Sequence, residues 1–104
     1  MSEKNLYTSA QIARAYQLME VLSGHEFDPL TAKQIRERTG WDGTTTTRQC
    51  QAAESAGFVE MTADKRWRLA PKKMTNIAVS VQHGIQRAKS RFEDEATNFT
   101  RSMI

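Results

Sequence analysis

The chain has 104 residues, of which 38% are hydrophobic and 26% charged, and its net charge is +3. This length predicts one compact domain with at most an appended arm, and the composition excludes wholesale disorder. No apolar run approaches the roughly 20 residues of a membrane span and no signal peptide is present, so we expect a cytoplasmic protein without a membrane partner.

The first predicted helix begins after Ser9, which is a favoured N-cap residue, and ends at Gly24. Its apolar residues recur at spacings of three and four, which is typical of one buried helical stripe. We therefore expect one face of this helix to lie in the core, formed by Ile12, Ala15, Tyr16, Met19 and Leu22.

A short second helix is predicted between Thr31 and Gly40. Thr31 and Gln34 have the spacing of a capping box, and Gly40 supplies a left-handed stop. After a turn over residues 41–43, a third helix begins around Thr44 and runs to Ala56. The sequence thus predicts two helices that flank a three-residue turn.

Two short strands follow, Phe58–Met61 and Arg66–Leu69, joined by a turn over residues 62–65. Trp67 alternates with two arginines along the second strand, so it points to the opposite face of the hairpin. We expect Trp67 in the core and the basic residues outside.

Beyond a hinge at Pro71–Lys73, a long helix is predicted from about Thr75. Its apolar stripe, which only Glu95 interrupts, consists of Ala78, Val81, Ile85, Ala88, Phe92 and Phe99. We predict a compact domain over residues 1–73 and a helical arm over residues 74–104 that forms a homodimer. The alternative is that the arm folds back onto Tyr16 and Leu22 of its own domain.

The predicted fold class is mainly α with a small β-hairpin: a winged helix-turn-helix followed by a long C-terminal helix. Residues 31–73 resemble the DNA-binding domain of the IclR family of bacterial transcription regulators. The resemblance extends over about residues 9–78 and rests on Ile35 and Gly40, Thr45 and Arg48, Gly57–Glu60, and the basic-aromatic-basic run Arg66–Leu69.

The resemblance implies that double-stranded DNA is the partner. Regulators of this family continue into an effector-binding domain, which we do not expect here because the chain ends after a single helix. The layout is similar to that of small DNA-binding proteins of Mu-like transposable phages, so we expect a phage or prophage origin.

Basic residues are concentrated where this resemblance lies, with nine basic and five acidic side chains between residues 31 and 73. A recognition helix reads base edges with the outer face of its first turns, and a basic wing contacts phosphates. The candidate DNA contacts are Thr44, Thr45, Thr47, Arg48 and Gln51 on the third helix and Lys65, Arg66 and Arg68 on the wing. Thr44 could instead serve only as the helix cap, and the wing could be an ordinary charged hairpin.

No catalytic set and no cofactor or metal site is predicted. The single cysteine, Cys50, and the two histidines, His25 and His83, are far apart in the sequence. We therefore expect a dimeric, sequence-specific regulator that is not an enzyme, whose half-sites lie about one DNA turn apart. The alternative is a winged-helix module that binds proteins within a replication or transcription assembly.

Overall fold

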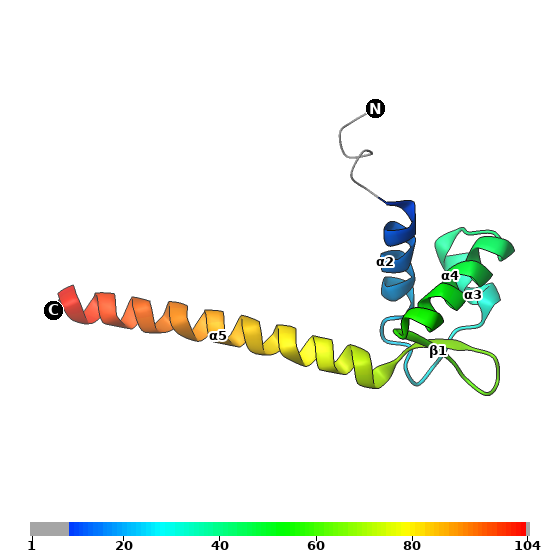
Figure 1. Cartoon of the computed structure of the whole chain (residues 1–104). Helices are drawn as coiled ribbons and strands as arrows, with labels where there is room; N and C mark the ends of the chain where they lie inside the picture. Colours follow the sequence, from blue (N-terminus) through cyan, green and yellow to red (C-terminus); the bar gives the residue numbers. More distant parts are fainter. Residues whose placement is uncertain (1–8, 104) are drawn as a thin grey trace, which may run out of the picture. The chain divides into compact units, whose positions relative to one another are not determined.

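The computed structural model describes residues 9–103, with side chains up to Arg101. The elements are α2 (Ala10–Leu22), α3 (Ala32–Thr39), α4 (Gly43–Ala56), β1 (Val59–Met61), β2 (Trp67–Leu69) and α5 (Pro71–Met103) (Figure 1). The predicted fold class is confirmed. The chain divides into two compact units, Met1–Lys73 and Met74–Ile104. None of the described helices is long and apolar enough to cross a membrane.

Helix α2 begins after Ser9, whose side chain accepts a hydrogen bond from the backbone amide of Ile12. The predicted buried stripe is wrong in part: Ile12 is 72% exposed and Tyr16 63% exposed, whereas Leu18 and Leu22 are fully buried. The helix carries apolar residues on two faces, and spacings of three and four fit either face. The tertiary contacts of α2 select the Leu18–Leu22 face.

Helix α3 has the predicted capping box. The Thr31 side chain accepts from the Gln34 amide at 3.2 Å, and the Gln34 side chain accepts from the Thr31 amide at 2.9 Å. Gly40 ends the helix with φ 78°, a left-handed conformation that costs glycine nothing because it has no Cβ. The helix is thus defined at both ends by local chemistry.

Helix α4 begins one residue earlier than predicted. Its N-cap is Asp42 and not Thr44, because the Asp42 carboxylate accepts from the Thr45 amide at 2.7 Å. Thr44 is therefore an exposed first-turn residue. The helix ends at Gly57, which has φ 93°.

The two strands are antiparallel, with Val59 opposite Leu69 and Met61 opposite Trp67. Each strand is one residue shorter than predicted. Leu30 adds a bridge to the hairpin, since its amide and carbonyl both bond to the backbone of Trp67, at 3.0 and 2.7 Å. Trp67 is buried, as predicted.

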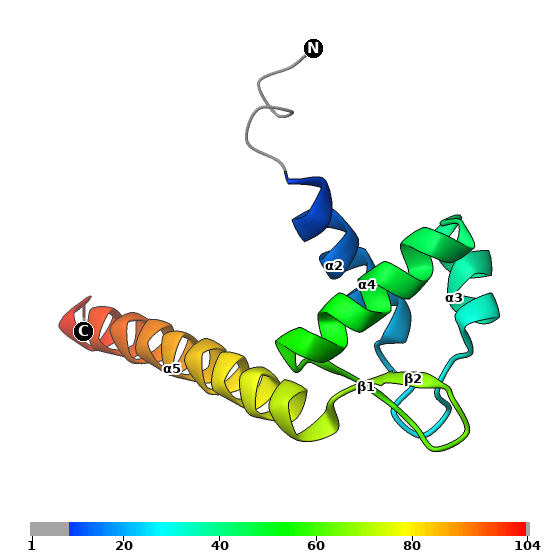
Figure 2. The same ribbon diagram turned by 45° about the vertical axis from the view of Figure 1, so that its right-hand side comes forward.

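The core of the first unit lies where the three helices and the hairpin meet (Figure 2). Helix α2 packs on α3, α4 and β2, and α4 also packs on α3 and β1. The buried apolar residues are Leu18, Leu22, Leu30, Ile35, Cys50, Ala53, Val59, Trp67 and Leu69. Burying this apolar surface is the main source of stability for so small a unit.

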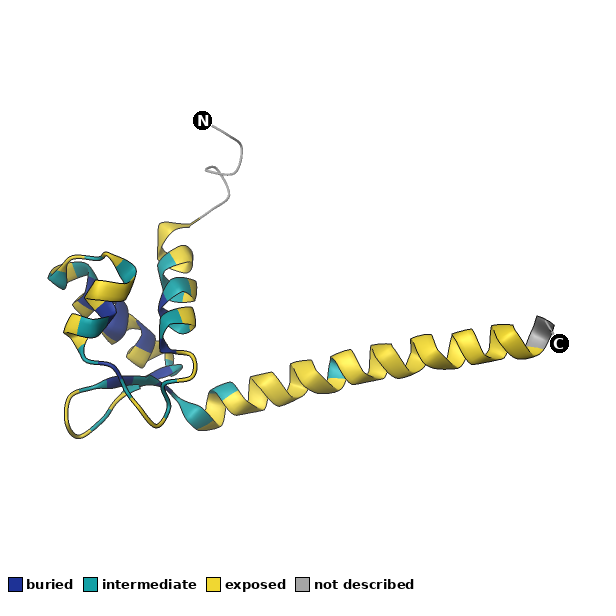
Figure 3. Cartoon of the chain, turned by 180° about the vertical axis from the view of Figure 1, so that it is seen from behind, coloured by how far each residue is buried: buried dark blue, intermediate teal, exposed yellow. Residues whose placement is uncertain are grey.

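Helix α5 begins at Pro71 and not near Thr75, so the predicted hinge at residues 71–73 is helical. Proline is favoured at the first position of a helix, because its missing amide hydrogen would have no partner there and its φ is already helical. The helix is exposed along nearly all of its described length (Figure 3).

Replacing Leu18 with alanine should lower the free energy of unfolding by about 2–5 kcal/mol, because it leaves a cavity at a fully buried position. Replacing Ile12 on the same helix should change it by less than about 0.5 kcal/mol, because that side chain is exposed. Urea denaturation followed by circular dichroism measures both values. Equal losses would show that the buried face of α2 is wrongly assigned.

Candidate nucleic-acid interface

The turn between α3 and α4 is held by its own side chains. The Thr39 hydroxyl donates to the Ile35 carbonyl at 2.8 Å and accepts from the Trp41 amide at 3.2 Å. From α2, the Gln17 side chain reaches the Thr39 carbonyl at 3.5 Å. These bonds fix the direction in which the chain enters α4.

The inner face of α4 consists of small and polar residues. Thr46, Gln49, Cys50 and Ala53 are buried. The Thr46 hydroxyl donates to the Asp42 carbonyl at 2.8 Å, and the Gln49 amide donates to the Gln11 side chain at 2.9 Å. The Thr46 bond lies within α4, whereas the Gln49 bond joins α4 to α2. Together with the burial of Cys50 and Ala53, the bond to Gln11 holds one rotational setting of α4 against the core.

That setting decides which residues of α4 face outward. Thr44, Thr47, Arg48 and Gln51 are spaced by three and four and are all exposed, whereas Thr45 is half-buried at the edge of this face. Gly43, Thr44, Thr47 and Arg48 line one shallow hollow at the start of the helix. The structure thus brings most of the predicted recognition residues onto one outward face.

The Asp42 carboxylate lies near cationic groups of two helices at the start of α4. The pKa of its carboxyl is lowered, first by the hydrogen bond from the Thr45 backbone amide and also by the charges of Arg36 and Arg48. Arg36 comes from α3 and Arg48 from α4. Two guanidinium groups therefore flank the exposed start of the helix.

Sequence reasoning did not propose Lys33 and Arg36 as site residues. Both line a second shallow hollow with Glu37, Gly40 and Trp41, on the outer side of α3. The sequence pattern of α3 could have indicated them. Ile35 is the one buried residue of this two-turn helix, so its basic neighbours must face away from the core.

The predicted wing residues have different surroundings. Arg66 is ion-paired with Asp64 at 3.1 Å and donates to the Pro29 carbonyl at 3.3 Å. Arg68 is paired with Glu60 at 2.6 Å, a bond between facing residues of the two strands. Lys65 lies exposed in the turn of the hairpin, with φ 61°. The two arginines thus help to hold the hairpin, and Lys65 extends from its tip.

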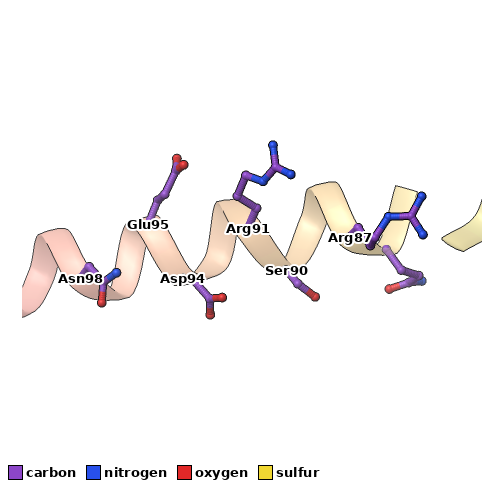
Figure 4. Close-up of a pocket in the computed structure, with 7 residues that line it drawn as sticks. Arg87, Ser90, Arg91, Asp94, Glu95 and Asn98 are labelled. Atoms are coloured by element: carbon purple, nitrogen blue, oxygen red, sulfur yellow. The ribbon is translucent and has the colours of Figure 1, made fainter. Parts of the chain in front are cut away.

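The second unit, described up to residue 103, is a single helix. Side chains including Arg87, Arg91, Asp94 and Glu95 project outward from it and line only a shallow, open hollow (Figure 4). The predicted dimerisation residues of α5 are all exposed: Ala78, Val81, Ile85, Ala88, Phe92 and Phe99. Within the described residues, no group of three His, Cys, Asp or Glu side chains could hold a metal ion.

Three helices that contain a helix-turn-helix, followed by a β-hairpin, define a winged helix-turn-helix domain. The structure is similar to the crystal structure of an IclR transcriptional regulator from Alicyclobacillus acidocaldarius, with a TM-score of 0.61 and 28% sequence identity. The match covers 71% of this chain and 30% of that regulator. No protein-family model matches the chain, and no curated protein matches it.

Burial raises the pKa of the Cys50 thiol from 9.0 to about 11. Since the folded protein holds this proton more tightly than the unfolded chain does, the thiol stabilises the fold below about pH 9, and this contribution is lost as the pH rises towards 11. The free energy of unfolding should fall over that range by up to about 3 kcal/mol more in the wild type than in the Cys50→Ala variant. Urea titrations at several pH values test this, and parallel pH profiles for the two proteins would contradict it.

Proposed function

We propose that this chain is a sequence-specific, double-stranded DNA-binding protein that regulates transcription as a homodimer and has no catalytic activity. The observation that carries the proposal is the outward face of α4, where Thr44, Thr47, Arg48 and Gln51 are exposed together on a helix whose inner face is fixed in the core. The similarity of fold to a transcriptional regulator supports it. The cytoplasmic location and phage or prophage origin expected from the sequence remain part of the proposal.

In this proposal, the start of α4 enters the major groove, which is wide enough to admit a helix. Arg48 donates two hydrogen bonds to a guanine, and Gln51 pairs with an adenine. Thr44, Thr45 and Thr47 contact phosphates or thymine methyl groups. Lys33 and Arg36, which lie beside this face, add phosphate contacts from α3.

The hairpin serves as the wing along the phosphate backbone. Lys65 supplies its exposed cation, and Arg66 and Arg68 add positive charge while their side chains, 38% and 34% exposed, remain paired with carboxylates. These contacts carry no sequence information, because every phosphate presents the same charge. Their role is affinity, which weakens as salt rises.

The competing function is a winged-helix module that binds another protein. The pairing of Arg66 with Asp64 and of Arg68 with Glu60 favours this alternative, because it neutralises part of the charge that a DNA-binding wing needs. The net charge of +3 is also modest. The outward threonines of α4 weigh against it, because the centre of a protein-binding surface is enriched in aromatic residues, methionine and arginine, and of these the face of α4 has only Arg48.

Selection from a random-sequence duplex library at two salt concentrations separates these functions. An enriched inverted repeat would support a dimeric regulator that binds an operator. Retention that is independent of sequence and lost with salt would indicate an architectural DNA-binding protein. No retention at either salt concentration would favour the protein-binding module.

Replacing Arg48 with alanine should relax specificity at one position of the selected site by about 1–3 kcal/mol. Replacing Lys65 or Arg66 with alanine should weaken binding to all sequences about equally and lower the salt dependence by about one charge. Fluorescence anisotropy on the selected site and on its single-base variants measures both effects. If the Arg48 variant lost affinity equally for every sequence, the base-reading role would be wrong.

A further inference from the structure

Helix α5 has an apolar stripe, interrupted only by Glu95, that is open to solvent over residues 77–99. Val81 is 56% exposed, Ile85 59%, Phe92 76% and Phe99 67%. With 33 residues, α5 is about 50 Å long at 1.5 Å per residue. Apolar side chains exposed in such a row mark a binding surface, and a stripe along one straight helix fits another helix.

Six charged residues in the middle of α5 lie in two adjoining blocks on either side of Phe92. Arg87, Lys89 and Arg91 form the basic block, and Glu93, Asp94 and Glu95 form the acidic block. Figure 4 shows Arg91 and Glu95 projecting to the same side of the helix. Glu95 also occupies the one charged position within the apolar stripe. A helix that binds this surface must therefore match two charges of opposite sign in a fixed order.

A second copy of α5 places opposite charges near each other only when the two helices run antiparallel. In a parallel pair each residue lies opposite its own copy, so basic block meets basic block and the two Glu95 carboxylates meet in the apolar seam. Like charges at such positions repel. In an antiparallel pair centred on Arg91 and Phe92, Lys89 lies opposite Asp94 of the other chain, and Arg87 and Arg91 lie opposite positions next to its acidic block.

We propose that two chains pair through α5 in antiparallel orientation, centred near Phe92. This inference rests on the homodimer of the proposed function and adds its direction. Residues from about 80 to 103 overlap, over about 36 Å, and the opposed charge blocks fix the register. The two Met74 residues, where the second units begin, then lie about 52 Å apart along the pair, instead of side by side.

Distances between spin labels test the direction of pairing in the full-length protein. Two variants, Asn76→Cys and Ser90→Cys, are made in a Cys50→Ala background, and each cysteine is labelled with a nitroxide. Both positions are exposed. The antiparallel pair gives about 46 Å between the two Asn76 labels along the helix axis and less than about 25 Å between the two Ser90 labels. Ser90 is the matched control, because it lies near the centre in either direction.

Short distances at both positions would show a parallel pair and overturn the proposal. A monomer in sedimentation, with no distance between chains, would also overturn it and would indicate that α5 folds back or binds another protein. DNA retention is measured separately on the same labelled proteins. If the labelled proteins pair but do not bind DNA, the proposed function fails, whereas the distances still decide the direction of pairing.

Charge reversal provides an independent readout that needs no label. Replacing Arg87, Lys89 and Arg91 with glutamate makes both blocks acidic and should raise the dimer Kd at least about tenfold, because each acidic block then lies beside another acidic block and attraction changes to repulsion. Adding Glu93→Lys, Asp94→Lys and Glu95→Lys to this variant exchanges the two blocks in both chains of the dimer. This second variant should restore the wild-type Kd. A parallel pair predicts little change in either variant, since like charges face each other throughout, and that result would overturn the proposal.

Discussion

The hydrogen bond from the Thr45 amide to the Asp42 carboxylate sets the start of α4, and the geometry of the candidate interface depends on that start. If the helix began at a different residue, the exit from the turn at Gly40 would no longer lead into the same first turn. The bond is also the largest cause of the lowered pKa of Asp42, and the charges of Arg36 and Arg48 lower it further. One short side chain therefore caps the helix and places a negative charge near two arginines.

The small residues on the inner face of α4 reduce the apolar surface that the helix buries, but they allow close packing. Thr46, Cys50 and Ala53 bury much less apolar surface than leucines would, at about 0.8 kcal/mol for each missing CH₂ group. In return, α4 can lie close to α2 and α3. The buried Thr46 hydroxyl bonds to the Asp42 carbonyl within α4, and the Gln49 amide bonds to Gln11 of α2. The bond to Gln11 restricts rotation of α4 against α2, because a hydrogen bond requires one geometry.

The sequence predicts well those features that local chemistry decides. The capping box at Thr31, the glycine stops and the alternation that buries Trp67 each depend on residues within a few positions. The buried face of α2 was mispredicted in part: Leu22 is buried as predicted, but Ile12 and Tyr16 are exposed. The two apolar faces of the helix differ only in which one meets the rest of the fold. The bonds of Arg66 to Pro29 and of Leu30 to Trp67 join residues 37 positions apart, and no local pattern encodes them. Outward residues of α4 were predictable, whereas the internal pairing of the wing arginines was not.

The stability of a helix pair does not explain why a glutamate stands at position 95 in the apolar stripe of α5. An alanine or leucine there would extend the apolar stripe, but a uniform stripe pairs in either direction and in several registers. A single carboxylate in the seam penalises the arrangements that bring it opposite its copy, and the adjoining basic and acidic blocks favour the arrangement that does not. In the proposed antiparallel pair, the loss of apolar burial at Glu95 and the two charge blocks thus act together to set the direction of pairing.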